Sequence, residues 1–451
     1  MHAEPANSLR EFSLQVVERL QQSGRAAFWV GGCVRDFLLG REPGDYDVAT
    51  DALPEEVEKL FPHTVAVGRK FGVVVVLEQG LQVQVATFRA EADYRDGRHP
   101  ETVAFGGAEA DALRRDFTVN GLFYEPIAGK LYDWVRGEQD LRAKIIRTIG
   151  LPAQRFGEDH LRLLRAVRLA AQLGFEIEPE TFAAVKSLAA KIQAISAERI
   201  REELIRLFRP PHAARGLELL RESGLLEQVL PEIAATALCA QSPEFHPEGN
   251  VFQHLKLMLS QLPPQAHPSL PWAVLLHDVA KPLTASTDPA SGAIHFYGHE
   301  KLGAEMGQSI LERLRFPRRQ IEEIMVAVRC HMQFKDAPRM RKSTLRSLLL
   351  RPTFPLELEL HRLDCLGSHG RLDIFDFLVE QARALENQPQ IRPPLLKGDD
   401  LIRLGMKPGP RMGAMLAELR EKQLQDELKT SQDARQWVAA QLQVRGDGTE
   451  E

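Results

Sequence analysis

Glycines and paired carboxylates stand close together near the start of the chain. Residues 28–50 read FWVGGCVRDFLLGREPGDYDVAT. The apolar residues at its start predict a strand that ends at Gly31 and Gly32, where the missing β-carbons let backbone N–H groups approach an anion. Asp45 and Asp47 are two apart on an expected second strand, whose period of two points both carboxylates to one side. Two oxygen ligands beside a phosphate site predict Mg²⁺ and phosphoryl-transfer chemistry.

Charged side chains recur in a second cluster. Residues 113–121 read LRRDFTVNG. Arg115 can clamp triphosphate oxygens bidentately, and Asp116 and Asn120 can form hydrogen bonds with a ribose. An alternative interpretation is a charged helix start at which Asp116 is the N-cap. Arg35, in the first cluster, is expected on the helix that the glycine turn opens.

A third cluster has helical spacing. Residues 155–175 read RFGEDHLRLLRAVRLAAQLGF. Its charged residues recur every three positions and are expected along one helical stripe, opposite the apolar residues: Asp159, Arg162, Arg165 and Arg168. Gly174 is a natural end for that helix. Three arginines on one stripe repel one another and need an anion or a carboxylate partner, although a solvated basic face has the same spacing.

The composition is ordinary for a globular chain and narrows the function classes. With 451 residues, 44% hydrophobic and 26% charged, we expect about two to four domains with large cores. A net charge of −5 gives no global attraction for nucleic acid, so an RNA contact must use a local basic surface. We find no leader pattern and no long apolar run, and expect a cytoplasmic protein without a membrane partner. The cysteines lack metal-ligand spacing and are expected to be reduced core residues: Cys33, Cys239, Cys330 and Cys365.

Together the three clusters resemble the motifs of the class II tRNA nucleotidyltransferase (CCA-adding enzyme) and bacterial poly(A) polymerase family. That family's signature reads GGxVRDxLLG, then DxD after a short gap, then RRDFTxN and EDxxR, and each pattern is found here in this order. Residues 197–203, AERIREE, match a further family element, a helix that braces the third cluster. The resemblance is dense over residues 1–210 and loose beyond them.

The resemblance implies an activity and a role for each motif residue. It implies template-independent addition of C and A residues to the tRNA 3′ end from CTP and ATP, by two-metal phosphoryl transfer that releases pyrophosphate. Asp45 and Asp47 would be catalytic and hold Mg²⁺, and Asp159 and Arg162 would read the Watson–Crick edge of the incoming base. The implied nucleotide-binding residues also include Gly32, Arg35, Arg115, Asp116, Asn120, Arg165 and Arg168. One position departs from many relatives, because Gln84 stands where they carry an acid.

A second constellation of possible metal ligands lies further along the chain. The segment LLHDVAKP contains an adjacent His277 and Asp278 before Lys-Pro and resembles the HD phosphohydrolase superfamily. By position in that superfamily, the metal ligands would be His254, His277, Asp278 and Asp364. His299 and His331 fall where a second metal would lie. Imidazole and carboxylate ligands suit Mn²⁺ or Ni²⁺ as well as Mg²⁺. The alternative is a degenerate HD fold that only adds to the RNA-binding body.

The predicted fold class is α+β. We expect a nucleotidyltransferase head over residues 1–146, with a mixed or antiparallel sheet and flanking helices, because segments 73–77 and 81–88 read as a hairpin. An all-α neck that selects nucleotides and binds RNA (147–238), an HD domain (239–388) and a helical tail (389–451) are expected to follow.

Three other functions stay open at this point. A poly(A) polymerase is the nearest, since residues 68–71 resemble part of that branch's signature, but the continuation differs and the tail is not basic. An enzyme that adds only the terminal A, or only the two C residues, has the same motifs. In a different class, the HD module would be the working phosphohydrolase and the head would only bind RNA. No oligomeric state is predicted.

Overall fold

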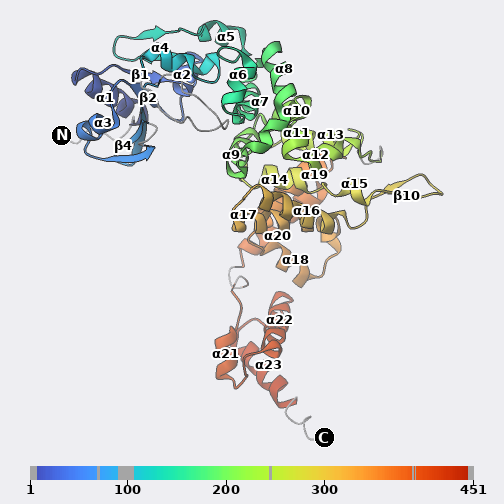
Figure 1. Cartoon of the computed structure of the whole chain (residues 1–451). Coiled ribbons are helices and arrows are strands. Elements are labelled where there is room, and N and C mark those ends of the chain that lie inside the picture. Colours follow the sequence, from blue (N-terminus) through green and yellow to red (C-terminus); the bar gives the residue numbers. More distant parts are fainter. Residues whose placement is uncertain are drawn as a thin grey trace. The chain divides into compact units, whose positions relative to one another are not determined.

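The computed structural model describes residues 8–68, 72–89, 106–242, 246–388, 391 and 393–444 (Figure 1). The chain separates into two compact units, Met1–Ala234 and Ala235–Glu451. The first contains a mixed sheet with helices and the second is almost entirely helical, so the expected α+β class is confirmed. The finer division at residues 146, 238 and 388 stays a prediction. Residues 69–71, most of the segment that resembles the poly(A) polymerase signature, lie outside the described part.

A seven-stranded sheet forms the centre of the first unit, in the order β3-β4-β5-β2-β1-β6-β7. The strands are β1 (Ala27–Val30), β2 (Asp47–Thr50), β3 (Thr64–Gly68), β4 (Val73–Glu78), β5 (Leu81–Thr87), β6 (Phe123–Glu125) and β7 (Lys130–Tyr132). Only β2 and β5 run parallel, and the other neighbouring pairs are antiparallel. The predicted β4–β5 hairpin is confirmed. Its two turn residues, Gln79 and Gly80, have φ of 48° and 83°, as a tight hairpin turn requires.

The helices of the first unit follow the hydrophobic pattern of the sequence. They are α1 (Ser8–Gln22), α2 (Gly32–Leu38), α3 (Pro54–Leu60), α4 (Ala108–Leu113), η2 (Thr118–Asn120), α5 (Gly137–Ala143), α6 (Pro152–Glu158), α7 (Leu161–Leu173), α8 (Pro179–Leu188), η3 (Ala189–Ala194), α9 (Ala197–Leu207), α10 (Ala213–Glu222), α11 (Leu226–Val229) and α12 (Pro231–Ala235). A two-residue parallel pair, β8 (Ile145–Ile146) with β9 (Glu176–Ile177), joins them. Helix α7 packs on α9 and α10 and ends at Gly174, whose φ of 68° confirms the predicted stop.

A buried apolar helix organises the second unit. Every side chain of α14 (Leu270–Leu276), LPWAVLL, is buried, which puts the two residues that follow it, His277 and Asp278, in the interior. Around it lie η4 (Thr236–Leu238), α13 (Val251–Ser260), α15 (Lys281–Thr284), α16 (His299–Arg313), α17 (Arg318–Cys330), η5 (His331–Arg339), α18 (Lys342–Leu349), α19 (Phe354–Gly367) and α20 (Asp373–Glu386), with the short pair β10 (Ser286–Thr287) and β11 (Ile294–His295). The last helices, α21 (Gly398–Arg403), α22 (Pro410–Leu424) and α23 (Ser431–Val444), share their own apolar cluster.

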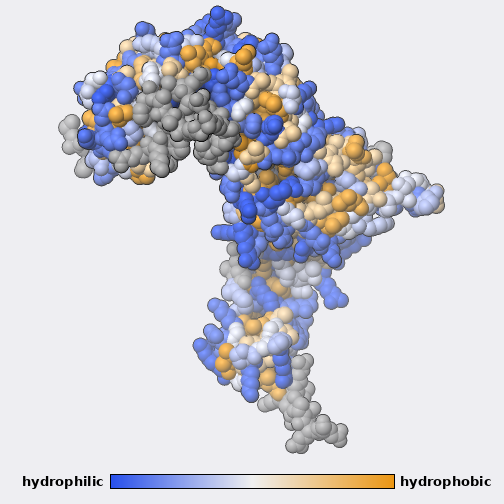
Figure 2. All heavy atoms as spheres, viewed as in Figure 1, coloured by the Kyte–Doolittle hydropathy of each residue, from blue (hydrophilic) through white to orange (hydrophobic). Residues whose placement is uncertain are grey.

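The surface is predominantly hydrophilic on the face drawn in Figure 2, with apolar side chains scattered between charged ones. A few large apolar residues are strongly exposed, among them Leu238 and Tyr297. Within the described residues, no helix combines the length and the apolar character that a membrane crossing needs.

Candidate functional site

A polar hollow of about 400 Å³ lies in the first unit, a size suited to a nucleotide-sized ligand. The ends of β1, β2 and β5 line it, together with the segment around residues 114–120 and helices α7 and α9. Eight of the residues predicted from the sequence meet there: Gly32, Asp47, Arg115, Asp116, Asn120, Asp159, Arg162 and Arg165. Arg35, Asp45 and Arg168 are not among its lining residues.

The glycine turn lets a guanidinium come close to the chain after β1. Gly31 has φ of 75°, and a β-carbon there would stand 3.1 Å from Nη1 of Arg115. Arg115 is held in turn by Asp111, whose Oδ2 accepts a hydrogen bond from Nη2 at 2.9 Å, and its guanidinium lies over the ring of Phe123. A glycine at position 31 is therefore needed both for the backbone conformation and for the approach of Arg115.

The two aspartates of the first cluster differ in position. The expectation that both lie on a strand is wrong for Asp45, because β2 begins at Asp47, which pairs with Val30 at the end of β1. Beyond Val30 the chain turns at Gly31, so β1 offers no partner for Asp45, which is exposed. The burial pattern still alternates, with Tyr46 buried between the two acids, as side chains on one side of an extended segment require.

The electrostatics at Asp47 favour a cation. Burial, and then the negative charge of Asp45, raise the pKa of Asp47 to about 6, and only the charge of Arg115 opposes them. Two carboxylates that repel each other at a partly buried position are relieved by a divalent cation between them. The carboxylates of Asp45 and Asp47 therefore form a donor set that fits Mg²⁺.

Gln84 lies beside the aspartates. Strand β5 runs parallel to β2, and Gln84 is the register partner of Asp47 and also lines the hollow. This chain therefore has a neutral amide next to Asp47, where the family resemblance predicts a third acid.

An ion pair connects the second cluster to the third. Oδ2 of the buried Asp116 accepts hydrogen bonds from Nη2 and Nε of Arg165 at 2.5 and 2.8 Å. Burial alone would raise the pKa of Asp116, but the charge and hydrogen bonds of Arg165, together with the charge of Arg162 and the N–H of Phe117, hold this pKa well below its usual range. Asp116 thus stays ionised, and it also accepts a hydrogen bond from the amide of Asn120.

Two predicted nucleotide-binding arginines have protein partners instead of a place in the hollow. Arg35 donates from Nη1 to Oδ1 of Asn120 at 2.8 Å, and Asp36 holds the rest of its guanidinium. Arg168 is buried and donates from Nε to the buried Glu203 of α9 at 2.5 Å. Both residues support the side chains that line the hollow.

Asp159 and Arg162, which the resemblance predicts to read the base, do not both lie on the expected helical stripe. Arg162 lies on α7, but Asp159 is extended, with φ of −149° and ψ of 106°, in the break between α6 and α7. Its Oδ1 accepts a hydrogen bond from the N–H of Leu161 and so satisfies one of the free N–H groups at the start of α7. The stripe prediction is therefore wrong for Asp159, because its side chain is used to start the helix.

Sequence reasoning missed the partners of that pair. Arg162 donates to Oε2 of Glu158 at 2.5 Å and to the carbonyl of Arg155 at 2.8 Å. Arg199 of α9 donates to both carboxylate oxygens of Asp159, and it also lines the hollow. The available signal was the match of residues 197–203 to a family element, in which Arg199 and Glu203 are four apart on one helix face.

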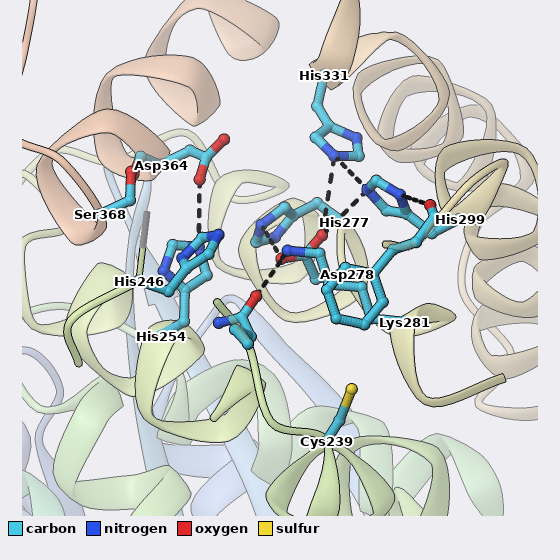
Figure 3. Close-up of polar contacts among 12 residues, drawn as sticks. Cys239, His246, His254, His277, Asp278, Lys281, His299, His331, Asp364 and Ser368 are labelled. Atoms are coloured by element: carbon cyan, nitrogen blue, oxygen red, sulfur yellow. Dashed lines mark hydrogen bonds and ion pairs between the residues drawn. The ribbon is translucent and has the colours of Figure 1, made fainter. Parts of the chain in front are cut away.

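The predicted HD residues converge in the second unit (Figure 3). Nε2 of His254 is 3.2 Å from Oδ1 of Asp364, and Nε2 of His277 is 3.2 Å from Oδ2 of Asp278. His299 and His331 approach the same Asp278, with Nε2 atoms 3.3 and 3.9 Å from its Oδ1. These side chains point toward one another: His277 and Asp278 follow α14, and the others come from α13, α16, η5 and α19. Gly367 of α19 allows α13 to pack closely, since a β-carbon there would be 2.9 Å from Cγ of Met258.

The imidazoles of this cluster are oriented as metal ligands. His277, His299 and His331 each place Nδ1 2.6–2.8 Å from the carbonyl of the residue three positions earlier. A carbonyl only accepts, so Nδ1 carries the proton and Nε2 presents its lone pair to the centre. Burial lowers the pKa of His331 to about 3, so it stays neutral.

Some buried polar atoms in the cluster have ion-pair contacts but form no hydrogen bond of normal geometry. Among the described residues these include Nε2 of His254, Nε2 of His277 and Oδ1 of Asp278. Unsatisfied buried atoms are rare and indicate a ligand or ion. The residues therefore fit a divalent metal: donor atoms of His254, His277 and Asp278 lie close together, and Asp364 lies beside His254. Glu248, missed in the sequence, accepts a hydrogen bond from Nδ1 of His254 at 2.8 Å.

Three family models match the chain. They are the poly A polymerase head domain over residues 27–147, the probable RNA and SrmB-binding site of polymerase A over 174–236, and the HD domain over 249–364.

Curated relatives match over different lengths. The chain is 45% identical to the CCA-adding enzyme of Geobacillus stearothermophilus over 223 residues, which is 49% of this chain and 55% of that protein. The chain thus spans about half the length of such relatives. It is 35% identical to the A-adding tRNA nucleotidyltransferase of Deinococcus radiodurans over 424 residues, 91% of this chain and 94% of that protein.

Solved structures share the fold. The CCA-adding enzyme of Bacillus stearothermophilus in complex with CTP is similar with a TM-score of 0.71 and 27% identity, over 97% of this chain and 98% of that one. The Thermotoga maritima CCA-adding enzyme complexed with tRNA has a TM-score of 0.52 at 20% identity, over 96% of this chain and 95% of that one.

The raised pKa of Asp47 predicts how Mg²⁺ affinity depends on pH. Below about pH 6 the carboxyl of Asp47 is protonated, so Mg²⁺ must displace a proton to bind. We expect the affinity measured by calorimetry to be constant above pH 7 and to fall by about tenfold per pH unit below pH 6. The Asp47→Asn variant should bind Mg²⁺ weakly, and its affinity should not fall steeply below pH 6. Equal affinity of the unaltered protein at pH 5 and pH 8 would contradict the assignment.

Proposed function

The chain belongs to the tRNA nucleotidyltransferase family, and from this we propose that it adds C and A residues, without a template, to the 3′ end of tRNA. CTP and ATP are the proposed substrates, pyrophosphate is released, and the proposed place of action is the cytoplasm. The observation that carries the proposal is the hollow in which Asp47, Arg115 and the Asp159–Arg162 pair meet. Its lining offers the Asp47 carboxylate for Mg²⁺, and hydrogen-bond donors and acceptors for a base.

The reaction is an in-line displacement at the α-phosphate. The 3′-hydroxyl of tRNA attacks this phosphorus, and the bond to the β,γ-pyrophosphate breaks. Mg²⁺ held by Asp45 and Asp47 would activate the hydroxyl and stabilise the leaving group. Arg115, fixed by Asp111, is placed to bind the triphosphate oxygens, because a guanidinium offers paired donors to phosphate. Asp116 and Asn120 remain the proposed contacts to the ribose.

Selection of the base is proposed for Asp159 and Arg162. Cytosine and adenine both present an amino group beside a ring nitrogen, a donor next to an acceptor. A carboxylate accepts from the amino group, and a guanidinium donates to the ring nitrogen. Uracil and guanine present a carbonyl in place of the amino group. Its oxygen would face the Asp159 carboxylate, and two acceptors cannot form a hydrogen bond.

A second candidate is addition of the terminal A alone. The similarity to the A-adding enzyme of Deinococcus radiodurans extends over 91% of this chain and favours this alternative. The decisive experiment incubates the protein with tRNA transcripts that end before the first C, after CC, and after CCA, each with labelled CTP or ATP. Addition of both C and A to the first transcript supports our proposal. Addition of A only to the CC transcript supports the alternative, and long A tails would identify a poly(A) polymerase.

The catalytic assignment predicts the effect of one carboxylate. Asp47→Ala should reduce nucleotide addition by more than about 10²-fold, since it removes a main electrostatic stabiliser, without lowering the melting temperature of the protein. Asp51→Ala is the matched control, because Asp51 is an exposed acid just beyond the other end of β2 and is not a lining residue of the hollow. Turnover of Asp47→Ala within a few-fold of the unaltered protein would refute the assignment.

For the second unit we propose an accessory phosphohydrolase activity that depends on a divalent metal. The metal, Mn²⁺ or Ni²⁺, would polarise the phosphate and supply hydroxide. His254, His277, Asp278 and Asp364 are the proposed ligands. The orphaned nitrogen and oxygen atoms at the centre of the cluster support this proposal over a purely structural one.

The accessory activity is tested separately from the main one. With Mn²⁺ or Ni²⁺ we expect the protein to hydrolyse a phosphomonoester or a 2′,3′-cyclic phosphate. The double variant His277→Ala, Asp278→Ala should lose this hydrolysis and keep nucleotide addition, since its two residues belong to the second unit and the hollow to the first. Metal binding without hydrolysis of either substrate would favour the degenerate, structural role.

A further inference from the structure

We propose that Arg199 is a specificity-determining residue of the nucleotide site, which sets the orientation of the Asp159 carboxylate toward the base. The inference rests on the proposed function, in which Asp159 accepts a hydrogen bond from the amino group of cytosine or adenine. Arg199 comes from a different helix, 40 residues further along the chain.

The hydrogen bonds of Asp159 leave a single direction open. Oδ1 accepts from the N–H of Leu161 at 3.0 Å and from Nη1 of Arg199 at 3.3 Å, and Oδ2 accepts from Nη2 of Arg199 at 2.7 Å. A carboxylate has about four acceptor positions, two on each oxygen. Three are therefore used within the protein, and the remaining one, on Oδ2, is available to the base.

Local backbone holds only one oxygen of Asp159. The residue lies in the extended break between α6 and α7, where the N–H of Leu161 donates to Oδ1, and Oδ2 accepts its hydrogen bond from Arg199. Arg199, in contrast, extends from α9, which packs on α7 and is fixed there by Glu203 through its ion pair with Arg168 at 2.5 Å. A rigid helix thus holds the carboxylate through both of its oxygens.

The pair is accessible to a ligand. The side chains of Arg199 and Asp159 are 29% and 21% exposed, and both line the hollow. Both oxygens of the Asp159 carboxylate already accept hydrogen bonds from one guanidinium, and a carboxylate has only acceptor positions to offer a ligand. It therefore favours the N4 amino group of cytosine and the N6 amino group of adenine, and it repels the O4 of uracil and the O6 of guanine.

The test measures discrimination between nucleotides by the full-length protein. We would determine kcat/KM for single additions of CTP, UTP, ATP and GTP to tRNA transcripts with Arg199→Gln, Arg199→Lys and Arg206→Gln. Arg206 is the matched control, since it lies on the same helix with its side chain 53% exposed and is not among the lining residues of the hollow. Thermal unfolding checks that each variant is folded.

We expect Arg199→Gln to lower the preference for CTP over UTP and for ATP over GTP by about tenfold or more, the effect of losing one charged hydrogen-bond partner. The change should appear mainly in KM for the correct nucleotides. Arg199→Lys should be intermediate, because a single ammonium group cannot hold both oxygens as a planar fork does. Arg206→Gln should match the unaltered protein.

Three results separate the possible failures. An unaltered protein that adds no nucleotide would overturn the proposed function itself. A selective unaltered protein whose Arg199→Gln variant is slower with all four nucleotides in the same ratio would show that Arg199 only supports the fold. If Arg199→Gln does not fold, Arg199→Lys decides, and unchanged discrimination in that variant overturns the inference.

Discussion

The ion pair between the buried Asp116 and the partly exposed Arg165 is the interaction on which the nucleotide site depends. It connects the segment after α4 to helix α7, two elements 49 residues apart in the sequence. Removing a carboxylate and a guanidinium from water is unfavourable, and their attraction offsets this only when the geometry is good and further hydrogen bonds are made. Such further hydrogen bonds are present here, because Oδ1 of Asp116 also accepts hydrogen bonds from the N–H of Phe117 and from the side-chain amide of Asn120. The pair thus fixes where the two halves of the site meet.

Other charged pairs extend this arrangement along the hollow and behind it. Arg115 is held by Asp111, Arg162 by Glu158, and Arg168 by Glu203. Each pairing orients a guanidinium before a ligand arrives, and donors that are already in place need little reorganisation when charge develops at the α-phosphate. The same pairings lower the repulsion between the arginines that recur along α7. The overall charge of −5 is therefore compatible with a site for triphosphates.

Local signals in the sequence predicted the elements well. The Gly31 turn after β1, the β4–β5 hairpin and the end of α7 at Gly174 each depend on a few neighbouring residues, and each is confirmed. The start of β2 was not predictable in this way. It depends on where β1 ends, a pairing between residues 17 apart, so Asp45 was placed on a strand that it does not join.

Contacts between residues that are distant in the sequence could not be predicted from local patterns either. Periodicity alone put Asp159 on a helical stripe, because nothing local indicates that its carboxylate starts α7 and binds Arg199. The convergence of His254, His277 and Asp278 came from a resemblance, since spacing does not show which helices pack together. Glu248 carried no recognisable signal, and its role as partner of His254 emerges only from the three-dimensional arrangement.

The most direct test of this account is a double-mutant cycle on the Asp116–Arg165 pair, with CTP and ATP affinity as the measured quantity. Asp116→Asn, Arg165→Gln and the double variant would be compared with the unaltered protein by calorimetry. If the pair positions the nucleotide site, each single variant weakens binding and the double variant is little worse than either, with a coupling energy of about 0.5–3 kcal/mol. Losses that simply add would show that the two residues act independently and would contradict the account.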